Sequence, residues 1–235
     1  MAVAKMKYLN KFNSIKEFKK YIEEELNIEN WFIMNLPIQE RIDTIRNKKY
    51  FTSLQELAKK QKINASDIEI LSWLDTLNQL YYTLDDMVES DLQIFQELEI
   101  PFSKKRIDYL LCHNNRILIL EYSLTNYKEE TLSYDNKLLQ AIRYKELLKN
   151  LLPDNIKIGI YVFLMKNEMT DYKIIKQQSK YCDIEVTENF DKQIDLYEFI
   201  NYYFYNAQRS AHYELLKCFD TIQNDFKYIK KSFSE

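Results

Sequence analysis

Glycine is almost absent from this sequence, because its 235 residues contain a single one, Gly159. Loops that cradle phosphate groups and the dinucleotide-binding fingerprint need several glycines, since only glycine lets the main chain approach the anion closely. No glycine-rich run of this kind is present. The sequence therefore excludes P-loop NTPases, protein kinases and Rossmann-type dehydrogenases.

Cysteine and histidine are scarce as well. The three cysteines, Cys112, Cys182 and Cys218, are widely spaced without a CxxC pair, and the chain has only two histidines. A disulfide framework or a structural zinc site is therefore not expected, and the thiols should be reduced and mostly buried. Two histidines and no glycine-flanked serine also argue against a Ser-His-Asp hydrolase.

Long apolar runs and a strong charge of one sign are missing too. No run approaches the roughly eighteen residues of a membrane span, and the opening MAVAKMKYLN has no signal-peptide core. With 46% hydrophobic and 29% charged residues and a net charge of -3, we expect a soluble, cytoplasmic protein without a membrane partner. The mildly acidic total leaves nucleic-acid binding open, because a local basic patch can still contact phosphates.

The chain shows no repeat, low-complexity linker or Pro/Gly-rich boundary, which favours a single domain over residues 1–235. We expect a helical extension over 1–65, a core over 66–190 and terminal helices over 191–235. Apolar residues at helical spacing predict helices at 14–27 with a Ser14 cap, from Ser53 with Glu56 in capping-box position, at 66–89, at 134–152 before Pro153, and from about 194 and 210.

Short apolar runs and period-two alternation predict the strands. They lie at 92–100, 106–113, 116–123 and 156–165, with a shorter one near 182–187. His113-Asn114-Asn115 is typical of a tight turn, so the second and third strands should form a hairpin. The order predicts an α/β fold with a central mixed sheet of four to five strands flanked by helices.

Two carboxylates lie in or beside these apolar strands. Asp108 is on the second predicted strand and Glu121 follows the run Ile-Leu-Ile-Leu on the third. A buried carboxylate costs several kcal/mol unless it is paired or binds a cation. Because the hairpin would bring both toward the same open end, they could form an oxygen-rich site for Mg²⁺ or Mn²⁺.

At this point the chain resembles the PD-(D/E)xK nuclease superfamily, whose fold is restriction-endonuclease-like. That family carries an aspartate on one strand and Glu-x-Lys on the next, matched here by Asp108, Glu121 and, in place of the lysine, Ser123. Gln140 and Tyr144 resemble the Gln-x-x-x-Tyr pattern of RecB-like relatives, and four residues apart they share one helix face.

A closer resemblance, over roughly 66–165, is to the nuclease domain that precedes certain bacterial schlafen-group helicases. The residues that carry it are Glu69, Ser72 and Trp73 in Glu-x-x-Ser-Trp, then Glu97, Pro101, Lys105, Arg106 and Asp108.

Together, the resemblances imply a metal-dependent nuclease with Mg²⁺ or Mn²⁺, in phage defence, restriction or repair. As its nucleic-acid partner we expect DNA ahead of RNA, although the sequence does not choose between them. We expect metal binding by Glu69, Asp108 and Glu121, catalytic roles for Asp108, Glu121, Gln140, Tyr144 and Lys137, and nucleic-acid contacts from Lys104, Lys105 and Arg106.

Ser123 leaves three outcomes open. Another lysine can replace the missing one, and Lys137 is the best candidate because it shares a helical stripe with Gln140 and Tyr144. Alternatively, two carboxylates and a metal act slowly alone. In the third case the site is inactive, and the protein binds nucleic acid or a protein partner, for instance as an inhibitor or assembly subunit in a phage-conflict system or as a homo-oligomer.

Each of these residues also has a purely structural interpretation. Asp108 and Glu121 could be exposed charges at strand ends, and Glu69 a first-turn acid favoured by the helix dipole. Gln140 and Tyr144 could serve packing or capping, and the three basic residues could form a solvated edge.

Overall fold

The computed structural model describes residues 6–27, 36–84, 91–100, 105–125, 130–166, 178–181 and 196–204, together with Leu215 and Phe219. Some side chains within these ranges, that of Ser123 among them, are outside the description.

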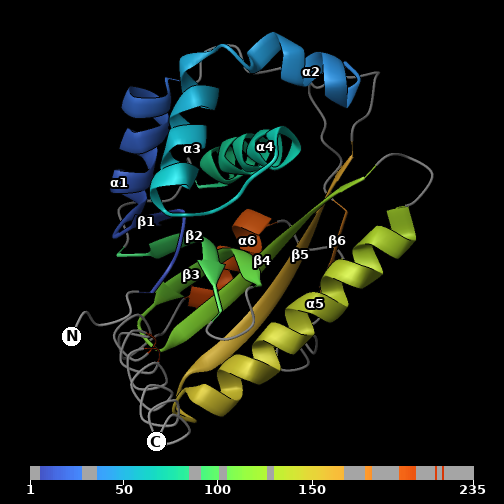
Figure 1. Ribbon diagram of the computed structural model, residues 1–235. Coiled ribbons are helices and arrows are strands. Elements are labelled where there is room, and N and C mark those ends of the chain that lie inside the picture. Colours follow the sequence, from blue (N-terminus) through green and yellow to red (C-terminus); the bar gives the residue numbers. More distant parts are fainter. Residues whose placement is uncertain are drawn as a thin grey trace, which may run out of the picture.

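A six-stranded mixed sheet forms the centre of the molecule (Figure 1). The strands lie in the order of the chain, and only β4 and β5 pair in parallel, the other neighbours being antiparallel. Their bounds are β1 (Asn10–Phe12), β2 (Gln93–Glu99), β3 (Arg106–His113), β4 (Arg116–Thr125), β5 (Lys157–Lys166) and β6 (Gln178–Tyr181). The predicted α/β class with a mixed sheet flanked by helices is confirmed.

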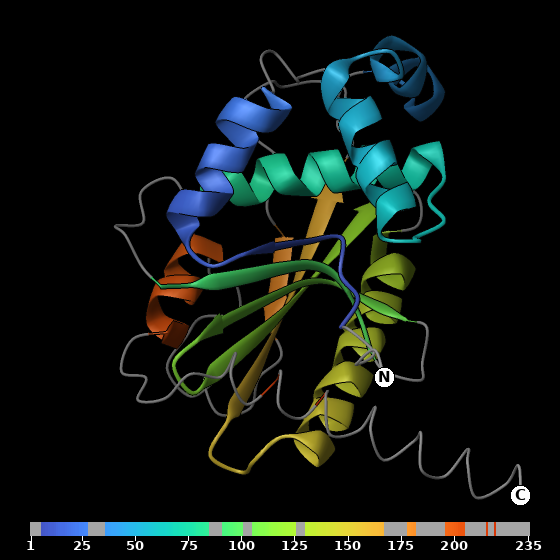
Figure 2. The ribbon, with the colours of Figure 1, turned by 60° about the vertical axis from the view of Figure 1, so that its left-hand side comes forward.

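Helices cover both faces of this sheet (Figure 2). They are α1 (Ile15–Lys20), the π-helical η1 (Tyr21–Leu26), α2 (Ile38–Ile45), α3 (Lys49–Lys60), α4 (Asp67–Thr83), α5 (Glu130–Leu151) and α6 (Leu196–Phe204). One apolar core lies between the sheet and α1, η1, α2, α3, α4 and α6, and the other lies between the sheet and α5. Helix α5 connects β4 to β5, as a parallel pair requires.

The hairpin between β3 and β4 is confirmed. His113 pairs with Arg116, and the turn consists of Asn114 and Asn115. Asn114 has φ 52°, a left-handed conformation that asparagine adopts more readily than most residues. The turn fixes the register and thereby sets Asp108 and Glu121 opposite each other.

Several predicted elements differ from the structure. Helix α3 begins at Lys49, so Ser53 lies inside the helix and does not cap it. Strand β1 and helix α2 were not expected, and β1 makes the segment 1–65 part of the sheet. The last described strand is β6, just before the predicted 182–187, which lies outside the described residues, as do the region around 210 and the end of the predicted 66–89 helix.

Buried polar groups also join the layers. Arg41 of α2 and Asp75 of α4 form a buried ion pair of 2.5 Å, which attaches α2 to the core. Cys112, expected to be reduced, is a buried free thiol. None of the helices that the structure describes combines the length and apolar character needed to cross a bilayer.

The sole glycine makes room for an aromatic side chain. A Cβ at Gly159 of β5 would lie 2.8 Å from ring atoms of Tyr203 on α6, whose hydroxyl donates a hydrogen bond to the Ile117 carbonyl. We expect Gly159→Ala to lower the free energy of unfolding by about 1–3 kcal/mol through overpacking. Urea denaturation checks this, and in a Tyr203→Leu background the same change should cost little. Equal costs in the two backgrounds would contradict the steric explanation.

Candidate active site

Three acidic residues lie side by side across three neighbouring strands. The register sets Glu97 of β2 opposite Asp108 of β3, and Asp108 opposite Glu121 of β4. Neither pair takes part in the backbone ladder: the β2–β3 pairing skips this row and the β3–β4 pairing stops beside it. The strands therefore open at the acidic row, which leaves space for side-chain chemistry.

At this row the side chains of Asp108 and Glu121 accept hydrogen bonds from main-chain N–H groups of the neighbouring strands. Asp108 Oδ2 accepts from the Tyr122 main-chain N–H at 2.8 Å, and Glu121 Oε1 accepts from the Asp108 main-chain N–H at 3.3 Å. Each carboxylate is thus held against the neighbouring strand. Unpaired main-chain donors inside a sheet are costly, so these bonds fix both side chains in place.

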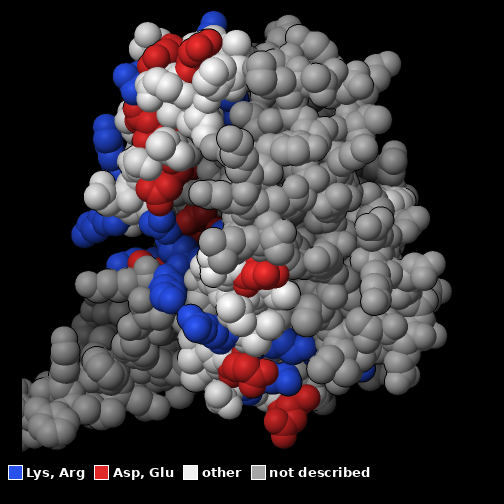
Figure 3. Space-filling view, turned by 90° about the vertical axis from the view of Figure 1, so that its right-hand side faces the viewer, with Lys and Arg blue, Asp and Glu red and all other residues white. Residues whose placement is uncertain are grey.

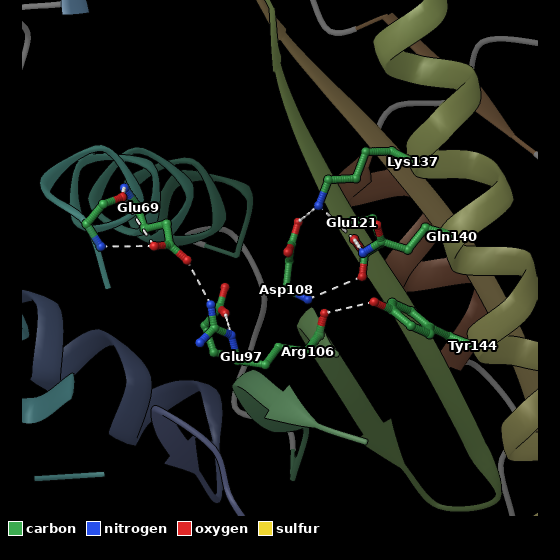
Figure 4. Close-up of polar contacts among 9 residues, drawn as sticks. Glu69, Glu97, Arg106, Asp108, Glu121, Lys137, Gln140 and Tyr144 are labelled. Carbon is green, nitrogen blue, oxygen red and sulfur yellow. Dashed lines mark hydrogen bonds and ion pairs between the residues drawn. The ribbon is translucent and has the colours of Figure 1, made fainter. Parts of the chain in front are cut away.

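Lys137 of α5 connects the two carboxylates (Figure 4). Its Nζ lies 2.8 Å from Asp108 Oδ2 and 2.9 Å from Glu121 Oε2. Burial and then the Asp108 charge raise the pKa of Glu121 well above its ordinary value. Burial lowers the pKa of Lys137, but the two carboxylates outweigh this and raise it above its ordinary value. The structure thus brings the predicted substitute lysine to the predicted pair.

The other two residues predicted on this helix also reach the site. Gln140 Nε2 donates to Glu121 Oε2 at 3.2 Å, and the Tyr144 hydroxyl donates to the main-chain carbonyl of Arg106 at 3.2 Å. Lys137, Gln140 and Tyr144 occupy one face of α5, as their spacing predicts. Tyr144 therefore contacts the strand that carries Asp108 rather than the carboxylates themselves.

Glu69 has a different position from the one expected. Its Oε2 accepts from the Ser66 main-chain N–H at 2.9 Å in a capping box at the start of α4. Its Oε1 pairs with Arg106 Nη2 at 2.8 Å. Glu69 lines the same pocket as Asp108, but its carboxylate contacts Ser66 and Arg106 rather than Asp108 or Glu121. Its role as a metal ligand stays a prediction.

Glu97 was matched in the sequence but was not assigned a role in the site. Its Oε2 lies 2.7 Å from Arg106 Nε, and the Trp73 side chain donates a hydrogen bond to it. Its φ is 53°, a conformation that is costly for a residue other than glycine or asparagine. The sequence signal was its match to the motif that carries the schlafen-group resemblance, whereas strand periodicity cannot reveal a positive φ.

A pocket of about 740 Å³ opens between α4 and α5 at this acidic row. Glu69, Glu97, Asp108, Arg106, Lys137 and Lys105 all line it. Figure 3 shows acidic and basic side chains interleaved on the described part of one face of the molecule. Of the predicted basic residues, Lys105 and Arg106 thus lie at the pocket, while Lys104 falls outside the described residues.

Within the ranges that the structure describes, no group of three or more His, Cys, Asp or Glu side chains is arranged to hold a metal ion. Instead, the carboxylates of Asp108 and Glu121 both contact the ammonium of Lys137.

No family model matches the sequence. No curated protein and no solved structure matches it significantly either. The resemblance to PD-(D/E)xK nucleases therefore stays an expectation from the sequence.

The buried Glu97 carboxyl should make stability depend on pH. Burial and then the Asp108 charge, opposed by the Arg106 charge, raise the pKa of Glu97 to about 8 from the ordinary 4.5. Between these values the folded protein holds more protons than the unfolded chain, so the free energy of unfolding falls as pH rises from about 4.5 to about 8. We expect the melting temperature of the wild type to decline across this range more steeply than that of Glu97→Gln.

Glu99→Gln is the matched control for this series. Glu99 lies on the same strand but pairs with Lys7 at 3.5 Å, away from the pocket. Its variant should keep the wild-type pH profile of the melting temperature. If the melting temperatures of the wild type and Glu97→Gln changed with pH in the same way, the raised pKa of Glu97 would be refuted.

Proposed function

We propose that this protein is a divalent-metal-dependent nuclease related to the PD-(D/E)xK superfamily, acting on nucleic acid in the cytoplasm. One observation carries the proposal: Asp108 and Glu121 converge on a single cation, the ammonium of Lys137. The acidic pair and the lysine required by the family pattern are therefore present together, although the lysine comes from α5 and not from position 123 of β4.

The residues fit a divalent ion. Both groups that converge are carboxylates, the donor type that Mg²⁺ and Mn²⁺ prefer. Glu121 is 0% exposed and Asp108 is its cross-strand neighbour, so the pair needs a nearby positive charge to stay ionised together. Asp108 and Glu121 would hold the ion, which would activate a water molecule and neutralise charge on the phosphate.

The surrounding residues have roles that follow from their contacts. Gln140 orients the Glu121 carboxylate through its amide, and Tyr144 fixes the main chain of β3 two residues before Asp108. Lys137 supplies the positive charge that Ser123 cannot, beside the carboxylates and at the wall of the pocket. A positioned cation next to a reacting phosphate stabilises the charge that develops during hydrolysis.

The substrate is a phosphodiester in a nucleic acid, with DNA expected ahead of RNA. A nuclease of this kind suits phage defence, restriction or repair. The test is to incubate the protein with labelled single-stranded DNA, double-stranded DNA and RNA in Mg²⁺, Mn²⁺ or EDTA, beside an Asp108→Asn/Glu121→Gln double variant.

Cleavage that needs the metal and disappears in the double variant is the expected result. Equal cleavage by both proteins would assign the activity to a contaminant or to another site. Absence of cleavage in every condition, with a folded wild-type protein, would refute the nuclease proposal and favour a binding module built on the same fold.

A further inference from the structure

The main chain at Glu97 departs from regular strand geometry within β2. Phe95 and Leu98 both face the α5 side, although residues three apart in a regular strand face opposite sides. The positive φ of Glu97 absorbs this irregularity. As a result the Glu97 carboxyl meets Trp73 of α4 and lines the pocket.

This carboxyl, which is only 7% exposed as a residue, has Arg106 as its ion-pair partner. Arg106 is held at three points, two on the guanidinium and one on the main chain. Glu97 pairs with Nε and Glu69 with Nη2, while Tyr144 binds the carbonyl oxygen. The two carboxylates come from different elements, so they fix the plane of the guanidinium as well as its position.

A fixed guanidinium at this place suits a phosphate. Arg106 lines the same pocket as Asp108 and Lys137, and its side chain remains 24% exposed. A guanidinium offers five N–H donors in a rigid fork that matches two phosphate oxygens, and the pairs with Glu97 and Glu69 involve only Nε and Nη2. Because the guanidinium of Arg106 is already held in place, it loses less conformational entropy when a phosphate binds.

We infer that Glu97 is a positioning residue that fixes Arg106 as a phosphate-binding group beside the Asp108–Glu121 pair. This inference rests on the proposed function, because it assigns the phosphate of the nucleic-acid substrate to Arg106. It also gives Glu69 a role as the second carboxylate that orients Arg106. The strained conformation of Glu97 is the cost of placing its carboxyl on the α4 side of the sheet.

The direction in which Glu97→Gln changes the affinity for DNA distinguishes a positioning role of Glu97 from a simple effect of net charge. Removing a negative charge from a pocket should strengthen the binding of a polyanion if only net charge matters. If Glu97 positions Arg106, Glu97→Gln should instead weaken binding by about tenfold, the effect of losing one charge-assisted hydrogen bond. Arg106→Gln should weaken it at least as much.

The experiment measures the Kd of a labelled single-stranded DNA oligonucleotide in EDTA by fluorescence anisotropy, using the full chain at about pH 9, where Glu97, with its pKa of about 8, is ionised. The variants are Glu97→Gln, Arg106→Gln and the double variant, with Glu99→Gln as the control on the same strand. We expect the double variant to bind no more weakly than Arg106→Gln, because Glu97 acts through Arg106. Glu99→Gln should remain within about twofold of the wild type, as expected for a surface pair.

Three results of this assay would overturn the inference: no binding by the wild type, unchanged or tighter binding by Glu97→Gln, or independent effects of the two substitutions. A separate calorimetric titration of Mn²⁺ into Glu97→Gln gives a fourth, loss of Mn²⁺ binding. The last would make Glu97 a metal ligand. Because the assay contains no metal, it is separate from cleavage. Binding that depends on Glu97 in a protein without nuclease activity would refute the proposed function while the positioning role stands.

Discussion

Lys137→Met is expected to lower the rate of phosphodiester cleavage by about 10²–10³-fold, the usual effect of removing one positioned electrostatic contact. The reason is that the ammonium between Asp108 and Glu121 is the charge that we propose as the replacement for the lysine absent at Ser123. Methionine keeps much of the length and apolar stem of the side chain, so the packing of α5 should persist. The measurement is single-turnover cleavage at saturating Mn²⁺.

The same substitution should leave Mn²⁺ binding intact or strengthen it. Lys137 occupies both carboxylates, and a cation that joins them has to compete with its ammonium. Lys149→Met is the control, since Lys149 is an exposed residue of α5 that pairs with Glu146 at 3.8 Å. If Lys137→Met cleaves at the rate of Lys149→Met, the lysine is structural and the proposed replacement of Ser123 is wrong.

Glu121→Gln should have the larger effect, a loss of cleavage of at least about 10³-fold, the upper end of the range for a single electrostatic contact. The substitution removes an oxygen that contacts Lys137 and Gln140, and also one of the two carboxylates proposed to hold the metal. Glutamine keeps the shape of the side chain at this fully buried position. Single-turnover assays and Mn²⁺ titration of the same preparation measure the two consequences.

The thermal stability of Glu121→Gln should not fall together with its activity. Burial and the Asp108 charge raise the pKa of Glu121, so the ionised carboxylate is unfavourable in the folded protein. We therefore expect Glu121→Gln to melt at or above the temperature of the wild type at pH 8, even though its activity is lost. A large drop in melting temperature, with activity in proportion to the folded fraction, would mean that Glu121 mainly supports the fold.

Much of the fold follows from local patterns in the sequence. The alternation in 106–113 and 116–123 and the Asn114-Asn115 turn specify the hairpin, because period and turn chemistry agree. The spacing of Lys137, Gln140 and Tyr144 sets them on one face of a helix, and the structure turns that face toward Asp108 and Glu121. In both cases the residues of one short segment are sufficient to predict the local structure.

Other features depend on contacts between distant segments. Strand β1 has three residues, too few for a period, and pairing with β2 defines it. Glu69 carries the same local signal whether it caps α4 or binds a metal, and its cap and its pair with Arg106 are visible only in the structure. The left-handed conformation of Glu97 arises where the ladders open at the acidic row, and no local pattern predicts it.

The most direct test of the central claim, that Asp108 and Glu121 form a divalent-metal centre, is calorimetric titration of Mn²⁺ into the wild type and the Asp108→Asn/Glu121→Gln variant. This measurement requires no knowledge of the substrate. The account predicts saturable Mn²⁺ binding by the wild type and its loss in the folded double variant. The same binding in both proteins, or none in the wild type, would contradict it.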